Sequence, residues 1–488
     1  MKLYEILDGI ACETTNAHGD CEIKDVVYDS RKAGEDTIFV CITGFQVDGH
    51  SFAKDAYNRG TRIFAVEKDI DLPSDATVVK VKDTRKFLAK ASANYFGKPA
   101  EKLNVIAITG TKGKTSTSFM LKSIYEAAGQ KVGVIGSTGT YIGDEQYDTD
   151  NSTPESYILH KYFRKMVDEG CETVIIEATS QGFMLSRTYG IKFNTGIFTN
   201  LSPDHIGAAE HCDFEDYLRC KKMIFKQSEK VIVNMDSEYF DRIVEGAECP
   251  IITYGSKMKA DYVFGGAMFT VGKDRLKTVF FCNENGENNE IDLNTPGYFS
   301  LYNATAAISA ARKDGIGYEA IKTGLRDTFV KGRMEIVPVN KEYTVIIDFA
   351  HNEYSVKTLF DTIKLYNPAH IISVFGCGGN RSKLRRYSMG EVIGKNSDLS
   401  VITSDNSRFE SVDDIISDIL VGMRKTDGKY VIIPDRREAI KEALRNAKEG
   451  DVVLLIGKGH EMYEEIEGVK YPFDEREVVF NALKELGQ

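Results

Sequence analysis

A strand, a glycine-rich turn and a helix follow one another between residues 103 and 129, and this segment constrains the fold more than any other. Val105 to Ile108 form a short apolar run of the kind found in buried parallel strands. The run stops at the turn Gly110 to Thr115. Apolar residues then recur at helical spacing until Gly129, which is placed for a left-handed C-cap. The sequence therefore predicts a phosphate cradle within an α/β fold.

The chemistry of this turn suits a nucleoside triphosphate. Its glycines let the backbone approach phosphate, and the amides at the helix start point toward the anion. Lys114 adds a positive charge, and the Thr115 hydroxyl can bind Mg²⁺. The spacing is a variant of the general P-loop, with Ile108 in place of its first glycine, so a plain turn entering a helix is the alternative. We expect ATP and Mg²⁺ as cofactors, with the ATP site formed by Gly110, Thr111, Lys112, Gly113, Lys114, Thr115 and Ser116.

Length and charge narrow the class of protein. A chain of 488 residues exceeds a single core and suggests about three domains. The net charge of −11 and the lack of a long basic block argue against nucleic acid as a partner. No run of 18 apolar residues and no signal segment are found, so we expect a cytoplasmic protein without membrane insertion. The nine cysteines form no CxxC pair, which favours reduced thiols over a zinc site.

Polar residues end the strand-like runs that follow the phosphate loop. Glu177 closes one run, and Asn200, Asp204 and His205 close another. The carboxyl ends of parallel strands share one sheet edge, so these side chains are expected near the nucleotide. A carboxylate such as Glu177 suits Mg²⁺, which prefers hard oxygen ligands. The alternatives are a helix-capping carboxylate for Glu177 and a structural role for His205.

The two ends of the chain carry further candidate ligand sites. In residues 1–100, the segment Tyr28–Arg31 and the loop Gly44–His50 either recognise a ligand or form ordinary turns. From about Lys331 onward, five apolar strands alternate with helical stretches, which predicts a Rossmann-like domain. Polar motifs end its strands, and several such motifs on one edge suggest a second ligand site. They are Asp348 with His351, Gly378–Arg381, Asp405–Arg408 and Gly457–Glu461.

The order of these motifs resembles that of the ATP-dependent Mur ligases of peptidoglycan synthesis. The resemblance covers essentially the whole chain. It rests on DSR, GFQVDG, TGTKGKTS, DNSTP, EATSQG, TNLSPDHIG, EDYLRCK, GRMEIV, DFAHN, FGCGGNR, SDNSR, GKGHE and FDEREV. It implies three domains: residues 1–100 for the UDP end of the substrate, residues 101–330 for ATP, and residues 331–488 for an amino acid. The fold class implied is α/β, with a mostly parallel sheet in the central P-loop ATPase domain and a Rossmann-like C-terminal domain.

The resemblance also implies the reaction and its site residues. A D-glutamyl carboxylate of UDP-N-acetylmuramoyl-L-alanyl-D-glutamate would be phosphorylated by ATP, and the acyl phosphate would then be attacked by an amino acid. Asn303, Arg333, Asp348 and His351 match family positions near ATP or at the hinge into the third domain. The residues implied for the UDP substrate are Tyr28, Ser30, Phe45, Gln46, Val47, Asn151, Ser152, Thr153, Thr179, Leu185 and Arg187.

Lys221 lies where the family carries a carbamylated lysine. A carbamate turns the cation into an anion that can bind Mg²⁺. Lys222 beside it is the competing candidate, and the spacing from Tyr217 favours Lys221. The implied metal ligands are Thr115, Glu177, His205 and Lys221 as N6-carboxylysine. The implied catalytic residues are Lys114, Glu177, His205 and Lys221.

The incoming amino acid is expected to be meso-diaminopimelate, with L-lysine or another diamino acid as the alternative. Arg408 can bind the distal carboxylate, which lysine lacks, and an unpaired Arg408 would repel a lysine ammonium. Against this, Ser407 replaces the proline of the diaminopimelate type, and Lys112 replaces an asparagine of the family motif. The implied amino-acid contacts are Arg386, Asp405, Asn406, Ser407, Arg408, Gly457 and Glu461.

Two other classes of protein are alternatives. A folate or cyanophycin-type ligase would share the phosphate loop, but it would not need both the DSR and the DNSR motifs. A non-catalytic nucleotide-binding regulator would not be expected to keep Lys114, Glu177, His205 and Lys221 together. The expected partners are small-molecule substrates, and a monomer is expected.

Overall fold

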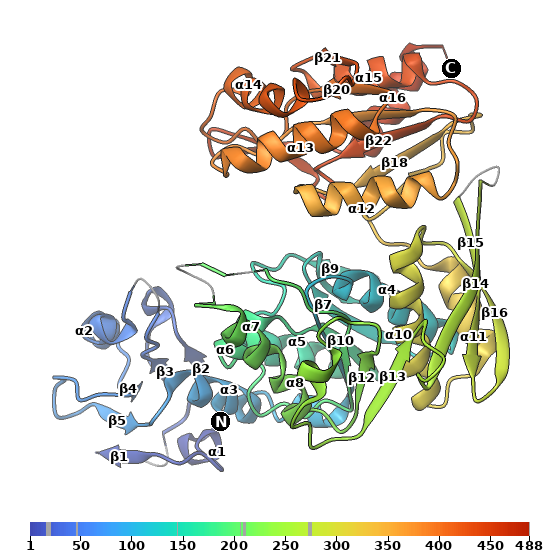
Figure 1. The fold of residues 1–488 in the computed structure, drawn as a ribbon. Helices are drawn as coiled ribbons and strands as arrows, with labels where there is room; N and C mark the ends of the chain where they lie inside the picture. Colours follow the sequence, from blue (N-terminus) through green and yellow to red (C-terminus); the bar gives the residue numbers. More distant parts are fainter. Residues whose placement is uncertain are drawn as a thin grey trace. The chain divides into compact units, whose positions relative to one another are not determined.

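The computed structural model describes residues 1–15, 21–44, 47–143, 145–204, 206–207, 211–271 and 276–487. By its internal contacts the chain divides into two compact units. The first comprises Met1–Val263 and Tyr302–Gly324, and the second Phe264–Leu301 and Leu325–Gln488. Both units combine helices with sheets (Figure 1). Within the described ranges, no helix is long and apolar enough to cross a membrane.

The N-terminal sheet has five strands in the order β1-β5-β4-β3-β2, and only β1 runs antiparallel. Side chains alternate between its faces, so that Ile38 and Val40 join one apolar cluster while Phe39 joins another. The strands are β1 Glu13–Thr15, β2 Asp25–Val27, β3 Thr37–Val40, β4 Ile63–Val66 and β5 Thr77–Lys80. The helices are α1 Leu3–Ile6, α2 Ala53–Asn58 and α3 Thr84–Tyr95, with 3₁₀ turns Ser30–Lys32, Gly49–Phe52 and Pro99–Lys102.

A larger, mostly parallel sheet forms the centre of the first unit. From β13 to β9 its strands follow the order β13-β12-β11-β6-β10-β7-β8-β9, and in this part of the sheet only β8 and β9 are antiparallel to their neighbours. The strands are β6 Asn104–Thr109, β7 Val132–Gly136, β8 Gly139–Ile142, β9 Glu145–Tyr147, β10 Thr173–Glu177, β11 Thr195–Phe198, β12 Val231–Asn234 and β13 Ile251–Gly255. The helices are α4 Lys114–Ala127, α5 Ser156–Asp168, α6 Ser180–Met184, α7 Phe214–Lys221, α8 Met223–Gln227, α9 Phe240–Val244, α10 Tyr298–Lys313 and α11 Tyr318–Asp327.

The register of this sheet aligns the ends of its three central strands. Glu177 of β10 lies opposite Ile108 of β6, and Phe198 of β11 lies opposite Thr109. In parallel sheets of this kind, ligands bind beyond the carboxyl ends of the strands. The residues that follow β6, β10 and β11 therefore share one edge.

The second unit contains a C-terminal sheet in the order β17-β18-β22-β19-β20-β21, parallel except for β17. Its strands are β17 Glu335–Val337, β18 Thr344–Asp348, β19 Ile371–Phe375, β20 Leu399–Ile402, β21 Tyr430–Ile432 and β22 Val452–Ile456. The helices are α12 Glu353–Lys364, α13 Lys383–Asn396, α14 Val412–Met423, α15 Arg436–Asn446 and α16 Glu475–Glu485. The remaining strands are β14 Tyr262–Val271, which begins in the first unit, β15 Leu276–Glu284, β16 Glu287–Leu293, β23 Tyr463–Ile466 and β24 Val469–Pro472.

Helices cover both faces of the C-terminal sheet (Figure 1). Val452 and Leu454 of β22 pack in the cluster formed with α12, α13 and α14. Val453 and Leu455, which point the other way, pack with α15 and α16. This two-sided burial explains why the strand reads as a continuous apolar run rather than an alternating one.

The predicted α/β class, the mostly parallel central sheet and the Rossmann-like C-terminal domain are confirmed. Residues 214–227 form two helices, α7 and α8, which meet at Lys222. Residues 264–301 are expected within the central domain, but their contacts assign them to the second unit.

Candidate functional site

The phosphate loop has the strand, turn and helix that the sequence predicts. Gly110 directly follows β6 and has φ +139°, and Gly113, with φ +87°, is the N-cap of α4. A Cβ at Gly113 would collide with Oδ1 of Asn303, and one at Gly110 would collide with Oγ1 of Thr199. Both positions therefore require glycine for conformation and for space.

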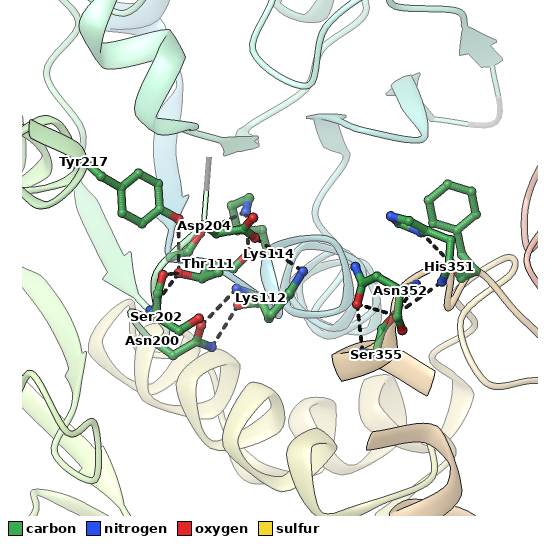
Figure 2. Close-up of polar contacts among 12 residues, drawn as sticks. Thr111, Lys112, Lys114, Asn200, Ser202, Asp204, Tyr217, His351, Asn352 and Ser355 are labelled. Carbon is green, nitrogen blue, oxygen red and sulfur yellow. Dashed lines mark hydrogen bonds and ion pairs between the residues drawn. The ribbon is translucent and has the colours of Figure 1, made fainter. Parts of the chain in front are cut away.

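The segment after β11 holds this loop in place. The Asn200 side chain accepts from the Lys112 amide at 2.9 Å and donates to the Lys112 carbonyl at 3.0 Å. Thr111 Oγ1 accepts from the Ser202 amide at 3.0 Å and lies 3.1 Å from the hydroxyl of Tyr217 (Figure 2). These bonds fix the shape of the loop, and they assign a positioning role to Asn200.

Lys112 points away from this framework. Its ammonium forms an ion pair with Asp204 at 3.5 Å, and both side chains are exposed to solvent (Figure 2). The lysine that departs from the family motif is thus accommodated by an acid at the end of a neighbouring strand. His205, the next residue, lies outside the described residues.

Two lysine side chains meet at one carbonyl oxygen. Gly110 O accepts from Lys114 Nζ at 2.9 Å and from Lys221 Nζ at 2.8 Å, and Lys114 also donates to Thr111 O at 3.2 Å. Lys221 is 2% exposed. Burial, and then the charge of Lys114, lower the pKa of Lys221 well below that of a free lysine. Both effects disfavour the charged form of the Lys221 amine.

Lys222 has a different environment. Its ammonium donates to Arg242 O at 2.9 Å, at the exposed side of the helix pair. Lys221, by contrast, lies over the ring of Tyr217 at 4.7 Å, one turn away on the same face of α7. The two neighbouring lysines are thus distinguished by burial, and Lys221 is the one beside the phosphate loop.

A cluster of oxygen donors lies at the start of α4. Thr115 Oγ1 donates to Glu177 Oε1 at 2.8 Å and lies 3.0 Å from Ser137 Oγ. The Ser137 amide also donates to Glu177 Oε1, at 3.2 Å. Glu177 is 2% exposed at the end of β10. A buried carboxylate and two hydroxyls form the hard-oxygen donor set that fits Mg²⁺.

The candidate residues for the muramoyl end lie beside this cluster. Thr153 Oγ1 donates to Glu177 O at 2.7 Å and accepts from the Thr179 amide at 3.0 Å. Arg187 donates to Thr153 O at 2.9 Å and to Glu155 at 2.7 Å. Thr153 therefore links the strand that carries Glu177 to a buried arginine.

Only some of the residues expected to bind the uridine end of the substrate belong to the part of the chain that the structure describes. Tyr28 is half-buried, and burial followed by the nearby charge of Glu155 raises its pKa. Ser30 begins a 3₁₀ turn, and Val47 is exposed. Phe45 and Gln46 lie outside the described residues. Among the other residues implied for the UDP substrate, Ser152, expected at the muramoyl-dipeptide, and Leu185 are half-buried, and Asn151 is exposed.

The candidate nucleotide residues fall in both units. Asn303, on α10, belongs to the first unit and contacts the phosphate-loop glycine. In the second unit, the Arg333 guanidinium lies 4.9 Å from the Phe349 ring centre. Asp348 accepts from the Met334 and Ala350 amides, both at 2.8 Å, and burial raises its pKa. His351 Nδ1 lies 2.8 Å from Phe349 O (Figure 2).

The amino-acid candidates gather around a cavity of about 210 Å³ in the second unit. All of them except Ser407 line it. Asn406 Nδ2 donates to Glu461 Oε2 at 2.7 Å. Burial, and then the charge of Asp405, raise the pKa of Glu461. The lining residues among the candidates are Arg386, Asp405, Asn406, Arg408, Gly457 and Glu461.

Both arginines of this cavity have carboxylate partners. Arg386, which is 1% exposed, pairs with Asp418 at 2.9 Å and with Glu410 at 2.8 Å. Arg408 donates to Glu465 Oε2 at 3.1 Å and to Gly379 O at 2.8 Å. The premise of an unpaired Arg408 is therefore wrong, and the argument that its bare charge would repel lysine carries less weight.

Family models match three segments of the chain. They are the Mur ligase family catalytic domain at residues 22–96, the Mur ligase middle domain at residues 108–311 and the Mur ligase glutamate ligase domain at residues 332–459. A protein of Clostridium perfringens is 40% identical over 491 residues, covering 99% of this chain and 100% of its own. The chain belongs to the Mur ligase family.

Two of the similar proteins and one similar solved structure share a name. The C. perfringens protein and a relative from Clostridium botulinum, also 40% identical and covering 95% of this chain and 96% of its own, are both called UDP-N-acetylmuramoyl-L-alanyl-D-glutamate--2,6-diaminopimelate ligase. A solved structure with the same name is 25% identical, has a TM-score of 0.74, and covers 100% of this chain and 99% of its own.

Sequence reasoning missed some residues of this Mur ligase site. Ser137 follows β7, whose partner β10 ends at Glu177, so the strand-end rule that selected Glu177 would also have found it. Tyr217 was used only for spacing, although its hydroxyl reaches Thr111. Glu465 was missed because it is 57 residues from Arg408, and no local pattern links the two.

Replacing Gly113 with alanine is expected to abolish ATP-dependent turnover of this Mur ligase. The change places a side chain at φ +87° and drives a Cβ into Asn303. The positive φ alone costs about 1–2 kcal/mol of unfolding free energy. Phosphate release and thermal unfolding measure the two effects.

Gly129→Ala is the matched control for this variant. Gly129 has φ +86°, and a Cβ there meets nothing within 4 Å. It should lose similar stability but keep its turnover. Equal turnover in the two variants would contradict the role of Gly113 in the loop.

Proposed function

We propose that the chain is an ATP-dependent ligase that adds meso-diaminopimelate to UDP-N-acetylmuramoyl-L-alanyl-D-glutamate. The observation that carries the proposal is the cavity of the second unit. It is lined both by the guanidinium of Arg408 and by the carboxylate of Glu461. These groups complement an amino acid whose distal end has a carboxylate and an ammonium. The shared name of the full-length relatives supports the same choice.

The proposal assigns one substrate to each domain. Residues 1–100 would bind the uridine end, residues 101–330 would bind ATP and the muramoyl peptide, and residues 331–488 would bind diaminopimelate. The site residues expected from the sequence take these roles, with His205 as a further metal ligand. Because the reaction consumes ATP, we place it in the cytoplasm.

The first chemical step is transfer of phosphate. An oxygen of the D-glutamyl carboxylate attacks the γ-phosphorus of ATP, the bond to the bridging oxygen breaks, and ADP leaves. The Lys114 ammonium donates to two carbonyl oxygens of the loop, and with ATP bound it would donate to phosphate oxygens instead. Mg²⁺ held by Thr115 and Glu177 would neutralise phosphate charge.

The second step forms the amide. The neutral amine of diaminopimelate attacks the acyl carbon, the bond to the phosphate oxygen breaks, and the amine proton passes to a base. Arg408 and Glu461 would hold the distal end of the acceptor, so that the reacting amine is the one at its other end.

We also propose that Lys221 is carbamylated. Its neutral amine would attack CO₂, forming an N–C bond and losing one proton to give an anionic carbamate. The lowered pKa of Lys221 supports this step because only an unprotonated amine is nucleophilic. The resulting oxygens would join Glu177 as hard ligands for Mg²⁺.

The test is phosphate release from ATP with the UDP-muramoyl dipeptide and either meso-diaminopimelate or L-lysine. We expect turnover with diaminopimelate and little with lysine. Arg408→Ala should raise KM for diaminopimelate about 10- to 100-fold, because it removes a hydrogen bond between charged groups.

Arg445→Ala is the control for Arg408→Ala, since Arg445 pairs with Glu442 on the exposed face of α15. It should behave as the wild type. Preference for lysine would overturn the acceptor and keep the ligase. No release with either acceptor would overturn the proposed function.

A further inference from the structure

Lys458 is a fully buried lysine with no role in the reaction described above. It follows β22 and is 0% exposed. Its ammonium donates to Asn406 Oδ1 at 3.1 Å and to Tyr463 O at 2.8 Å, and it lies 3.9 Å from Asp405 Oδ1. Burial of a charged group is costly unless the group is paired and hydrogen-bonded, and here it is both.

The Asn406 amide is oriented by this lysine. Its Oδ1 accepts from Lys458 Nζ and also from the Glu465 amide at 2.9 Å. With its oxygen held by two donors, Asn406 must turn Nδ2 toward Glu461, to which it donates at 2.7 Å. A flipped amide would place two donors against its NH₂ group and an oxygen against the Glu461 carboxylate.

Lys458 also balances charge in the cavity. Asp405 and Glu461 are two acids that line the same cavity, and the charge of Asp405 raises the pKa of Glu461. The charged groups that act on Glu461 are Asp405, Lys458 and Arg408. Of the two cations, Arg408 pairs with Glu465, whereas Lys458 lies beside Asp405.

We propose that Lys458 is a positioning residue for the acceptor amino acid: it fixes the Asn406 amide and offsets Asp405, and so presents Glu461 to the distal ammonium. This inference rests on the proposed function. It extends the acceptor site from the residues that line the cavity to a buried side chain behind them.

The test compares Lys458→Met, Lys458→Gln and the control Lys470→Met. Methionine keeps an unbranched side chain only one atom shorter than lysine but cannot donate, whereas glutamine keeps a donor and loses the charge. Lys470 lies in the hairpin β23–β24 with its ammonium 4.3 Å from the Tyr463 ring centre. Its replacement therefore shows the effect of disturbing the hairpin without changing a residue that lines the cavity.

Lys458→Met is expected to raise KM for diaminopimelate about 10- to 100-fold, with a smaller change in kcat. KM for ATP and for the UDP-muramoyl dipeptide should stay at the wild-type values. Lys458→Gln should show a smaller rise, and Lys470→Met none.

The pH dependence gives a second readout. Without the cation, Glu461 takes up a proton at a higher pH, so KM for diaminopimelate in Lys458→Met should rise more steeply than in the wild type as pH falls. A purely structural loss would raise all three KM values together and would lack this dependence.

The possible outcomes distinguish a failure of the role proposed for Lys458 from a failure of the proposed function. Active wild type with an unchanged KM for diaminopimelate in a folded Lys458→Met overturns the role of Lys458 alone. If Lys458→Met does not fold, an unchanged KM in Lys458→Gln overturns that role. Wild type that releases no phosphate with diaminopimelate overturns the proposed function together with this inference.

Discussion

Replacing Lys221 with methionine is expected to abolish ligation, lowering kcat about 1,000-fold or more because charge stabilisation by a bound metal is worth several kcal/mol. Methionine fills the same buried space but cannot form a carbamate. Phosphate release at saturating substrates measures the loss. Wild-type enzyme depleted of CO₂ should lose activity that bicarbonate restores, and the variant should not respond.

The fold of Lys221→Met should survive. Gly110 O keeps its hydrogen bond from Lys114, so the substitution leaves no orphaned acceptor there. Exchanging a buried polar group for an apolar side chain of similar shape is often neutral or stabilising. We therefore expect a melting temperature equal to or above that of the wild type.

The stability difference between these two proteins should depend on pH with a definite sign. Burial lowers the pKa of Lys221 in the folded state, so the unfolded chain binds more protons below the ordinary lysine pKa. Wild-type stability therefore rises with pH through this window relative to the methionine variant. Thermal unfolding of CO₂-depleted protein, in which Lys221 is a free amine, between neutral pH and pH 10 measures the trend.

Lys222→Met is the matched control for Lys221→Met, one residue away in the chain. Lys222 donates to Arg242 O and lies outside the phosphate-loop cluster. Its replacement should leave kcat within a few-fold of the wild type. Equal losses in the two variants would contradict a special role for Lys221.

Features of the site that depend on local chain geometry could be predicted from the sequence. The phosphate loop needs two glycines, one of them before a helix, and both have positive φ in the structure. Glu177 was found because an acid after an apolar run falls at the carboxyl edge of a parallel sheet. These inferences need only neighbours in the sequence and the rules of parallel sheets.

Features that depend on distant pairs were not predictable. Arg408 meets Glu465 only because the hairpin β23–β24 returns to the end of β20, and its segment also exchanges backbone hydrogen bonds with Arg408. The spacing from Tyr217 already favours Lys221 over Lys222, but the contact of Lys221 with the phosphate loop depends on how α7 packs, which the sequence alone does not reveal. The sequence names candidate groups, whereas packing decides which charges are paired.

The second large effect is expected from Glu177→Gln, which should lower kcat at least about 100-fold by weakening charge stabilisation through Mg²⁺. The side chains have nearly the same shape, and the glutamine oxygen can still accept from Thr115 and from the Ser137 amide. The variant therefore removes a charge while keeping the local hydrogen bonds. Its melting temperature should change little.

The dependence on magnesium distinguishes this loss from a general disturbance of the loop. Glu177→Gln should need a higher Mg²⁺ concentration for half-maximal phosphate release, whereas Glu126→Gln, which removes an exposed charge paired with Lys122 on α4, should not. A Cβ at Gly136 would strike Glu177, so close packing leaves the carboxylate little room to turn away from Thr115. The Glu177 carboxylate is therefore held in one position. An unchanged Mg²⁺ dependence in Glu177→Gln would contradict the proposal that Glu177 is a metal ligand.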